Sequence, residues 1–377
     1  MKRKVIQITI TEACNLNCIY CYEKNKDFRK MEISLAKSII KDSFSQSDSN
    51  DILEFDFHGG EIALAFTEIK TICEWAWGEK WNNEYIFHAT TNGTLIHGEI
   101  KQWFAINSHR FSLGLSLDGT EEMHNINRSN SYSLIDLDFF RKSWPNQTVK
   151  MTISPKTISM ADKGIIDIVN KGFKLTANLA YGQIWDGIDL RNQYRKALSR
   201  LVDFYLENPH LEVCNLVSLN LSTIGKNILL NRPRIHNKWC GAGQDMKCYS
   251  IDGTVYPCQM FNPSSNKIQD LNILNKIDIV NIPVEDCDSC ALLPSCPSCY
   301  GYNFIINGKI SKSPDELCDF RKLEALASSF LYGKMLQTPS KYVSTKNMNE
   351  AQIACTILGI DFIQKEFGKL GNIFTRV

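Results

Sequence analysis

Three cysteines near the N-terminus place the strongest limit on what this chain can be. They stand at positions 14, 18 and 21 in the segment TEACNLNCIYCY, residues 11–22. Residues 5–10, VIQITI, have the composition of a buried strand, so we expect three thiols on one loop at a strand end. Iron–sulfur cubanes are normally bound by four cysteine thiolates, so three ligands leave one iron open to a small molecule. A structural zinc site or three unrelated thiols are the alternatives, although this spacing is not common for zinc.

The rest of the first 208 residues alternates between segments with strand character and segments with helix character. We predict strands at 52–57, 85–90, 111–117, 147–154 and 173–180, and helices at 64–77, 97–105, 160–171 and 190–207. Such alternation predicts an α/β fold with a parallel sheet and outer helices. Special sequences follow three of the strands: GGE at 59–61, NG at 92–93 and SLDG at 116–119. Function in parallel β/α barrels gathers at these strand ends.

The cysteine segment, with Tyr20 between its last two cysteines, resembles the signature of the radical S-adenosylmethionine superfamily. The resemblance implies a 4Fe–4S cluster on Cys14, Cys18 and Cys21 whose open iron binds the methionine part of S-adenosylmethionine. It also implies reductive cleavage of this cofactor to a 5′-deoxyadenosyl radical that abstracts a hydrogen atom from the substrate. The fold implied is an open, partial (β/α)6 TIM-like barrel, in which the residue matching Tyr20 lies near the adenine.

The strand-end motifs extend the resemblance into the cofactor site. Gly59, Gly60 and Glu61 match a motif that binds the amino group of the cofactor, because glycines let a backbone approach a ligand and a carboxylate suits an ammonium. The positions of Asn92 and Ser116 match residues that tend to face the cofactor.

An arginine after the fourth strand commonly meets the cofactor carboxylate in this family. The run from Ser116 to Gly119, with His124 and Arg128, resembles the pattern of peptide- and protein-modifying members. We therefore expect Arg128 to bind the cofactor, with Arg141 as the competing candidate. We expect His58 and His124 to be structural.

A second group of eight cysteines occupies residues 240–318. Its layout is C-x7-C-x9-C, a gap, C-x2-C-x5-C-x2-C, another gap and a final cysteine, with an Asp-Gly hairpin turn at 252–253. Eight cysteines suit two four-cysteine sites, and a pair of zinc ribbons is the alternative to two clusters.

This layout resembles the SPASM domain, although its central run is slightly shorter than usual. The resemblance implies two auxiliary 4Fe–4S clusters, hence three clusters in all. Auxiliary cluster I is then expected on Cys240, Cys248, Cys258 and Cys299, and auxiliary cluster II on Cys287, Cys290, Cys296 and Cys318.

The absence of targeting signals in the sequence favours a cytoplasmic location. The 377 residues carry a net charge of +1, which gives no reason to expect nucleic acid or membrane partners. We find no signal peptide and no apolar run long enough to span a bilayer. Fourteen cysteines in such a chain are better metal ligands than disulfides, because the cytosol is reducing. Cys73, Cys214 and Cys355 stand outside the two groups and are expected to be small buried hydrophobes.

We predict four segments along the chain. They are a radical S-adenosylmethionine partial barrel at 1–208, a connector at 209–235, a small SPASM domain with a β-hairpin and short helices at 236–322, and a C-terminal helical segment at 323–377.

The resemblance implies an enzyme that oxidises a peptide or protein. We expect a maturase that crosslinks side chains of a ribosomally made precursor peptide through a cyclophane, another C–C or C–O link, or a thioether. The alternative enzyme is a formylglycine-generating sulfatase maturase, in which an Asp commonly stands where this chain has Gln259. An iron–sulfur electron-transfer protein and a zinc-stapled binding protein are the non-enzyme alternatives. Expected partners are the peptide substrate, a flavodoxin- or ferredoxin-type reductant, and a separate leader-binding protein where no leader site exists in the chain.

Overall fold

The computed structural model describes residues 1–185, 187–232, 240–265 and 287–370. The described residues form two compact units. The first comprises 1–150, 172–174 and 240–265, and the second comprises 151–171, 175–232 and 287–370. The four-segment division predicted from the sequence stays a prediction.

The first unit is built on a six-stranded sheet in the order β4-β3-β2-β1-β7-β8. Its strands are β1 (Arg3–Thr11), β2 (Ile52–Gly59), β3 (Tyr85–Thr91), β4 (Phe111–Leu115), β7 (Met246–Tyr249) and β8 (Val255–Tyr256). Pairing is parallel from β4 to β7, and only β7 and β8 are antiparallel. The predicted parallel α/β sheet is therefore confirmed.

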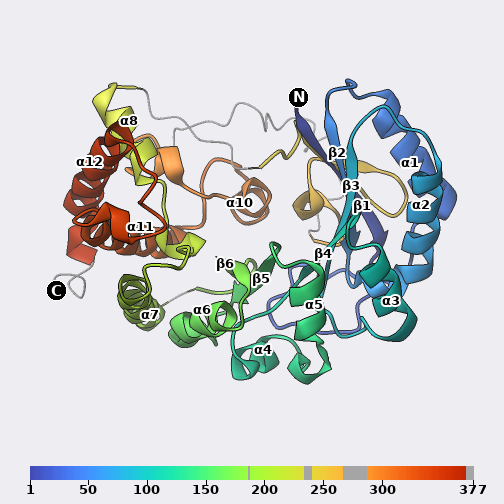
Figure 1. The fold of residues 1–377 in the computed structure, drawn as a ribbon, viewed down its shortest axis with the longest axis horizontal. Coiled ribbons are helices and arrows are strands. Elements are labelled where there is room, and N and C mark those ends of the chain that lie inside the picture. The colour runs from blue at the N-terminus through green and yellow to red at the C-terminus, as the bar shows by residue number, and fades with distance from the viewer. Residues whose placement is uncertain (186, 233–239, 266–286, 371–377) are drawn as a thin grey trace. The chain divides into compact units, whose positions relative to one another are not determined.

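Helices α1 (Ile33–Ser45), α2 (Phe66–Gly78) and α3 (Gly98–Ile106) cover one face of this sheet (Figure 1). The first unit also contains the short 3-10 helix η1 (Ile62–Ala65), α4 (Glu121–Asn127) and α5 (Leu137–Ser143). Alternate strand residues supply the apolar side of this layer and are fully buried: Leu53, Phe55, Phe57, Phe87 and Phe111. The ring of Phe44 on α1 lies 5.4 Å from that of Phe55, which fastens the first helix to the sheet.

The opposite face of the sheet is polar. Gln7 on β1 pairs in register with Cys248 on one side and with Asp56 on the other. The same row continues through His88 and Ser112 on β3 and β4. Directly paired residues of parallel strands point to the same face, so these five side chains share one side of the sheet. A closed barrel fills its interior with branched apolar residues, whereas this sheet leaves a polar surface.

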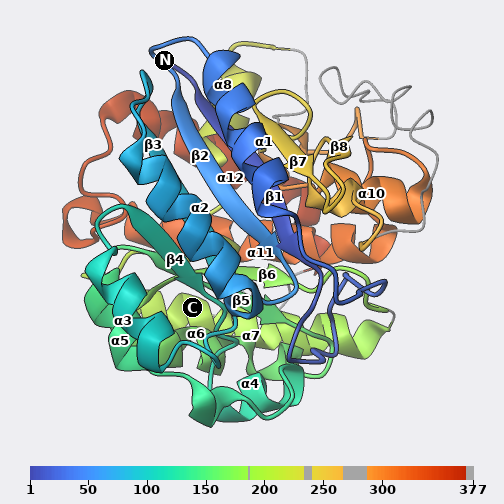
Figure 2. The same cartoon turned by 90° about the vertical axis from the view of Figure 1, so that its right-hand side faces the viewer.

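The cysteine-rich hairpin belongs to the same sheet. Strand β7 lies parallel to β1, and β8 turns back beside it (Figure 2). The predicted Asp-Gly turn is confirmed, since Gly253 has a φ of +84°. No local sequence pattern indicates that this hairpin, more than 200 residues after β1, extends the N-terminal sheet.

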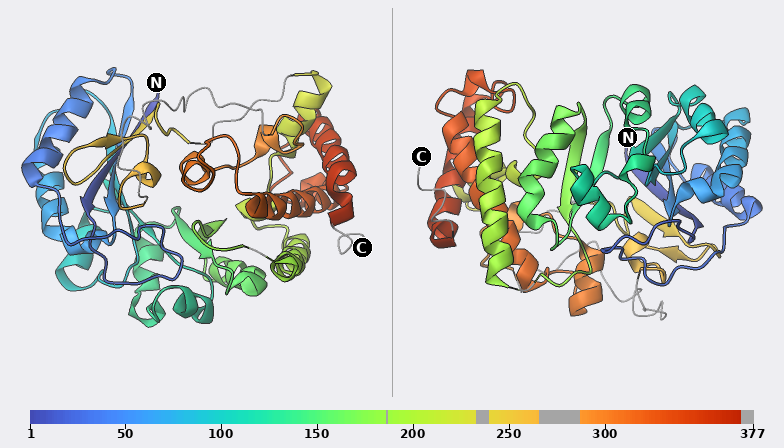
Figure 3. Two further views of the ribbon diagram at one scale, coloured as in Figure 1. Left: turned by 180° about the vertical axis from the view of Figure 1, so that it is seen from behind. Right: turned by 90° about the horizontal axis from the view of Figure 1, so that it is seen from below.

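The second unit is mostly helical. Its helices are α6 (Ala161–Asn170), α7 (Ile188–Glu207), α8 (Leu221–Leu229), α10 (Tyr300–Asn307), α11 (Asp315–Met335) and α12 (Glu350–Phe367). Strands β5 (Thr148–Ile153) and β6 (Lys174–Leu179) form a separate two-stranded sheet. Helix α12 packs against both α8 and α11, as the C-terminal red helices of Figure 3 show. Helix α8 falls within the predicted connector, residues 209–235.

Local signals explain where the last helix begins. The side chain of Asn349 accepts a hydrogen bond from the backbone N–H of Gln352, and the side chain of Gln352 accepts one from that of Asn349. This reciprocal capping box satisfies two backbone donors at the helix start. Among the described residues, no helix is long and apolar enough to span a membrane.

Candidate functional site

One cavity in the first unit gathers every residue predicted to hold the first cluster and its cofactor. Its volume is about 170 Å³. The predicted residues that line it are Cys14, Cys18, Tyr20, Cys21, Gly59, Gly60, Glu61, Asn92, Ser116 and Arg128. They follow the carboxyl ends of β1, β2, β3 and β4, where parallel strands place their functional groups. The structure therefore brings together residues that are 114 positions apart in sequence.

The two glycines of the GGE motif pack against the cysteine loop. A Cβ on Gly60 would lie 2.2 Å from the carbonyl oxygen of Ala13, and a Cβ on Gly59 would lie 1.7 Å from that of Thr11. Backbone hydrogen bonds join the same segments, from Gly60 N to Thr11 O at 3.1 Å and from Glu61 N to Ala13 O at 2.8 Å. The glycines are thus required for close approach to the chain's own backbone, in addition to the ligand contact predicted from the sequence.

Glu61 is buried and fixes the neighbouring strand end. Its carboxylate accepts hydrogen bonds from Thr91 Oγ1 at 2.5 Å, from Asn92 N at 2.7 Å and from Ala63 N at 3.1 Å. Burial raises the pKa of this carboxyl, while the hydrogen bonds act in the opposite direction. A carboxylate has about four lone-pair sites, so one remains for a ligand donor.

Asn92 and Ser116 complete the cavity from β3 and β4. Asn92 Nδ2 donates to Asn15 Oδ1 at 2.9 Å, and Asn92 Oδ1 accepts two hydrogen bonds from Thr94. One amide N–H of Asn92 is therefore left for a ligand. Ser116 N donates to Thr91 O at 3.0 Å, and Ser116 bridges to Lys150.

A buried network around Asp118 holds the arginine beside the cysteines. Asp118 Oδ2 lies 2.9 Å from Arg128 Nε, accepts the Tyr20 hydroxyl at 2.6 Å and accepts Asn127 Nδ2 at 3.2 Å. Arg128 also lies over the Tyr20 ring, 5.4 Å from its centroid. Burial opposes the guanidinium charge, but neighbouring Asp118 raises the pKa of Arg128 overall. Arg128 is therefore a fixed cation at the cavity wall.

His124 belongs to this network as a neutral group. Its Nδ1 accepts the backbone N–H of Asp118 at 3.3 Å, and its Nε2 lies 3.1 Å from Ser131 Oγ. Burial, together with the charge of Arg128, lowers the pKa of His124 to about 4. An uncharged, hydrogen-bonded imidazole agrees with the structural role expected for it.

The structure separates the two arginine candidates, and this difference yields a prediction. Arg141 is half exposed and pairs with Asp138 at 2.7 Å outside the cavity, whereas the Arg128 side chain is 10% exposed. Removing one partner of a buried pair costs about 3–5 kcal/mol. We expect Arg128→Gln to lower the free energy of unfolding by about 3 kcal/mol, because Asp118 keeps two other donors, and to weaken S-adenosylmethionine binding.

Urea unfolding and equilibrium dialysis with labelled S-adenosylmethionine measure both effects. Arg141→Gln is the matched control and should change neither quantity, because exposed ion pairs contribute little. Equal losses in the two variants would contradict the assignment of Arg128 to the cavity wall.

Sequence reasoning missed a second cation beside the cysteines. Lys26 and Glu23 line the cavity, and Glu23 lies 3.3 Å from His58 and 4.0 Å from Lys26. Burial opposes the charge on Lys26, but the neighbouring Cys21 and Cys14 raise its pKa overall. The only sequence signal was a lysine five residues after the last cysteine, which is too common a pattern to single out.

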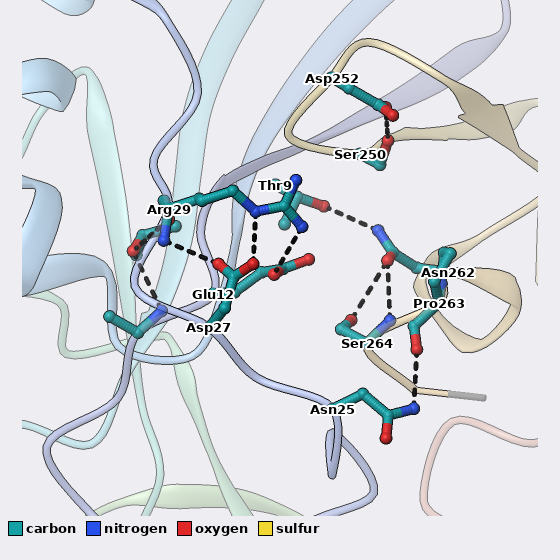
Figure 4. Close-up of polar contacts among 12 residues, drawn as sticks. Thr9, Glu12, Asn25, Asp27, Arg29, Ser250, Asp252, Asn262, Pro263 and Ser264 are labelled. Atoms are coloured by element: carbon teal, nitrogen blue, oxygen red, sulfur yellow. Dashed lines mark hydrogen bonds and ion pairs between the residues drawn. The ribbon is translucent and has the colours of Figure 1, made fainter. Parts of the chain in front are cut away.

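The segment after the cysteine loop is tied to β1 and to the hairpin region (Figure 4). Arg29 pairs with Asp27 and lies 3.6 Å from Glu12. Burial, together with the charge of Asp27, raises the pKa of Glu12 to about 7.

The same close-up shows the link to residues 262–264 (Figure 4). Asn262 Nδ2 donates to Thr9 Oγ1 at 3.3 Å, Asn262 Oδ1 accepts Ser264 N, and Asn25 Nδ2 donates to Pro263 O at 3.0 Å. Thr9 Oγ1 also lies 3.8 Å from the buried sulfur of Cys248. Polar contacts of β1 thus reach one of the cysteines of the second group.

A separate pocket in the second unit gathers the four cysteines predicted for auxiliary cluster II. Cys287, Cys290, Cys296 and Cys318 all line it, three from the loop before α10 and one from the first turn of α11. Burial raises the pKa of Cys296 to about 12 and that of Cys318 to about 11. A cluster bound at this pocket would require these thiols to lose their protons.

The four cysteines of this pocket supply a complete set of thiols for one cluster, and that assignment stays a prediction. Within the described ranges, no three His, Cys, Asp or Glu side chains are arranged to hold one metal ion. For auxiliary cluster I, Cys240, Cys248 and Cys258 belong to the first unit and Cys299 to the second, and this set stays a prediction.

Comparison with known proteins finds relatives that are named maturating enzymes. No protein-family model matches the chain. A cysteine-type anaerobic sulfatase-maturating enzyme of Clostridium perfringens is 25% identical over 278 residues, which cover 67% of this chain and 72% of that enzyme.

Solved structures share the fold. The structure of anSMEcpe with bound AdoMet has a TM-score of 0.65 at 17% identity and covers 94% of this chain and 98% of its own. Streptococcus suis SuiB bound to its precursor peptide SuiA has a TM-score of 0.55 at 16% identity, with 83% and 75% covered. In sequence the chain is similar to cysteine-type anaerobic sulfatase-maturating enzymes, and its fold is that of the solved structures of anSMEcpe and SuiB.

Proposed function

We propose that this enzyme cleaves S-adenosylmethionine reductively and uses the resulting radical to oxidise a peptide. The observation that carries the proposal is the single cavity that joins the three cysteines, the GGE motif and Arg128. The relatives support the substrate class, because one is named a sulfatase-maturating enzyme and SuiB was solved with a precursor peptide. The polar face of the sheet, opposite the helices, has Gln7, Asp56 and His88 in one row, and such a face suits a peptide better than an apolar ligand.

Different residues of the cavity are proposed to bind the cluster and S-adenosylmethionine. Cys14, Cys18 and Cys21 are proposed to bind a 4Fe–4S cluster through their thiolates. Bound cluster and S-adenosylmethionine supply one-electron reduction and hydrogen-atom abstraction. The free lone pair of Glu61 suits the cofactor ammonium, and the guanidinium of Arg128 suits its carboxylate. Asp118 keeps Arg128 in place from behind.

Two auxiliary clusters are proposed to complete the cofactor set. Auxiliary cluster II would use the four-cysteine pocket of the second unit, and auxiliary cluster I would use Cys240, Cys248, Cys258 and Cys299. Both would be fully ligated, so their part in the reaction is to accept the electron that the substrate radical must lose. A flavodoxin- or ferredoxin-type protein is the proposed reductant, and a separate protein is proposed to present the peptide leader.

A crosslink is our proposed product, and Gln259 is the reason. Its backbone N–H donates to Gln7 Oε1 at 3.2 Å, and its own Oε1 is buried without a hydrogen-bond partner among the described residues. An amide cannot take up a substrate proton as a carboxylate does at this position in sulfatase maturases. We therefore favour coupling of two side chains over formylglycine formation. The latter remains the second candidate because the sequence relative is a sulfatase-maturating enzyme.

Mass spectrometry of peptide substrates tests the proposal. The reconstituted enzyme is incubated with dithionite, S-adenosylmethionine and peptides encoded by small reading frames beside its gene. We expect one peptide to lose two hydrogen atoms and to show a new covalent link in its fragment pattern. A cysteine-containing sulfatase-motif peptide is run in parallel. Replacement of its thiol by an aldehyde, with every neighbouring peptide unchanged, would contradict the crosslink and establish the second candidate.

A further inference from the structure

A buried arginine lines the pocket of auxiliary cluster II. Arg321 lies one turn along α11 from Cys318, and both side chains border the pocket that Cys287, Cys290 and Cys296 complete. The Arg321 side chain is only 10% exposed. A guanidinium stays charged at every working pH, so the pocket contains a permanent positive charge.

The partner of this arginine stands away from the pocket. Arg321 Nη1 lies 2.7 Å from Glu324 Oε2, and the buried hydroxyl of Tyr194 donates to Glu324 Oε1 at 2.8 Å. Glu324 is not among the residues that line the pocket, whereas Arg321 is. The cation of this buried pair therefore faces the cysteines, and the carboxylate lies behind it.

The other cation of the pocket is weaker in effect. Lys322 also lines it, but its side chain is 30% exposed and its Nζ lies 3.1 Å from Asp319 Oδ1. Water and the neighbouring carboxylate screen its charge. Electrostatic interactions strengthen as the local dielectric constant falls, so the buried Arg321 dominates.

We propose that Arg321 raises the reduction potential of auxiliary cluster II and so makes it an electron acceptor. Four thiolates and a four-iron core carry net negative charge, and reduction adds one more. A fixed positive charge at the cluster stabilises the reduced form over the oxidised form. The charge, hydrogen bonding and burial around a cluster are the means by which a protein sets its potential. The inference rests on the proposed function, because it needs the cluster to be present.

Potentiometric titration followed by electron paramagnetic resonance tests the proposal without any peptide. The full chain carrying Cys14→Ala, Cys18→Ala and Cys21→Ala is reconstituted, so that only auxiliary clusters contribute. The transition that disappears on adding Cys290→Ala and Cys296→Ala belongs to auxiliary cluster II. We expect Arg321→Gln to change its reduced-to-oxidised ratio at fixed potential by at least about tenfold toward the oxidised form, about 59 mV for one electron.

Two further variants separate charge from structure. Glu324→Gln should shift the same midpoint upward, which a merely structural role of the pair would not produce. If Arg321→Gln fails to fold, Arg321→Gln/Glu324→Gln leaves no unpaired buried charge and should still lower the midpoint, because the cation is nearer the cysteines. Arg191→Gln on α7 is the control, since Arg191 pairs with Asp319 at 3.4 Å outside the pocket.

Each outcome decides the inference. The inference is overturned, and the proposed function stands, if the midpoint of Arg321→Gln falls within the range of the Arg191→Gln control. Where Arg321→Gln does not fold, the midpoint of the double variant decides in the same way. The absence of any transition that depends on Cys290 and Cys296 would overturn both the inference and the auxiliary cluster of the proposed function. Opposite shifts in Arg321→Gln and Glu324→Gln would establish the proposal.

Discussion

Replacing Cys14, Cys18 and Cys21 together by alanine should lower the iron content from about twelve to about eight per chain, given four irons per cubane. The three cysteines lie on one loop at the end of β1 and line one cavity, so their loss removes one cluster and leaves the other sets intact. Cleavage of S-adenosylmethionine should fall to background, because no other cysteine among the described residues lines this cavity.

Iron and acid-labile sulfide are measured after anaerobic reconstitution, and 5′-deoxyadenosine is measured by chromatography. Cys355→Ala is the control, because Cys355 on α12 stands outside both cysteine groups. It should retain all of the iron and full cleavage. Uptake of zinc with little iron by the wild-type chain would contradict the radical assignment. That result would agree with a zinc-binding scaffold protein instead.

Gly60→Ala should reduce S-adenosylmethionine cleavage by at least about a hundredfold, since a displacement of about 1 Å in a reacting group has this effect. The new methyl carbon would lie 2.2 Å from the carbonyl oxygen of Ala13, next to Cys14. Both atoms are fixed to backbone, so no side-chain rotation relieves the contact. The cysteine loop must move away from β2, and the three thiols move with it.

The same assays of iron content and 5′-deoxyadenosine apply to this variant. Gly78→Ala at the end of α2 is the matched control, because a Cβ there meets no atom within 4 Å. We expect Gly78→Ala to behave as wild type and Gly60→Ala to lose iron from the first cluster alone. Unchanged cleavage in Gly60→Ala would show that the loop tolerates displacement and that the motif serves the ligand only.

Much of the fold of the first unit could be predicted from local sequence patterns. The alternation of strands and helices in the first half predicted the parallel sheet, and the strand-end motifs predicted the residues of the first cavity. These patterns are readable because each depends on neighbours within about ten residues, either through burial periodicity or turn chemistry. The helices α4 and α5 were missed, since each has only seven residues and little periodicity to detect.

Contacts between segments far apart in the sequence could not be predicted from local patterns. Nothing local indicates that β7 pairs with β1, because strand pairing depends on which edge remains open after β1 to β4 assemble. Arg128 and Arg141 also look alike as sequence, and only burial against Asp118 separates them. The spacing of Arg321, three residues after Cys318 on a helical segment, places the two side chains on the same side of the helix. Whether that side faces the pocket depends on how α11 packs.

The amino-acid sequence by itself determined the chemistry of this protein, because cysteine spacing and glycine–carboxylate motifs fix which ligands one loop can offer. The tertiary structure decided how these groups act together: Gly60 against the cysteine loop, Asp118 behind Arg128, and Glu324 behind Arg321. The physical reason is that a side chain's charge and hydrogen bonds gain their strength from burial and from partners far away in the chain.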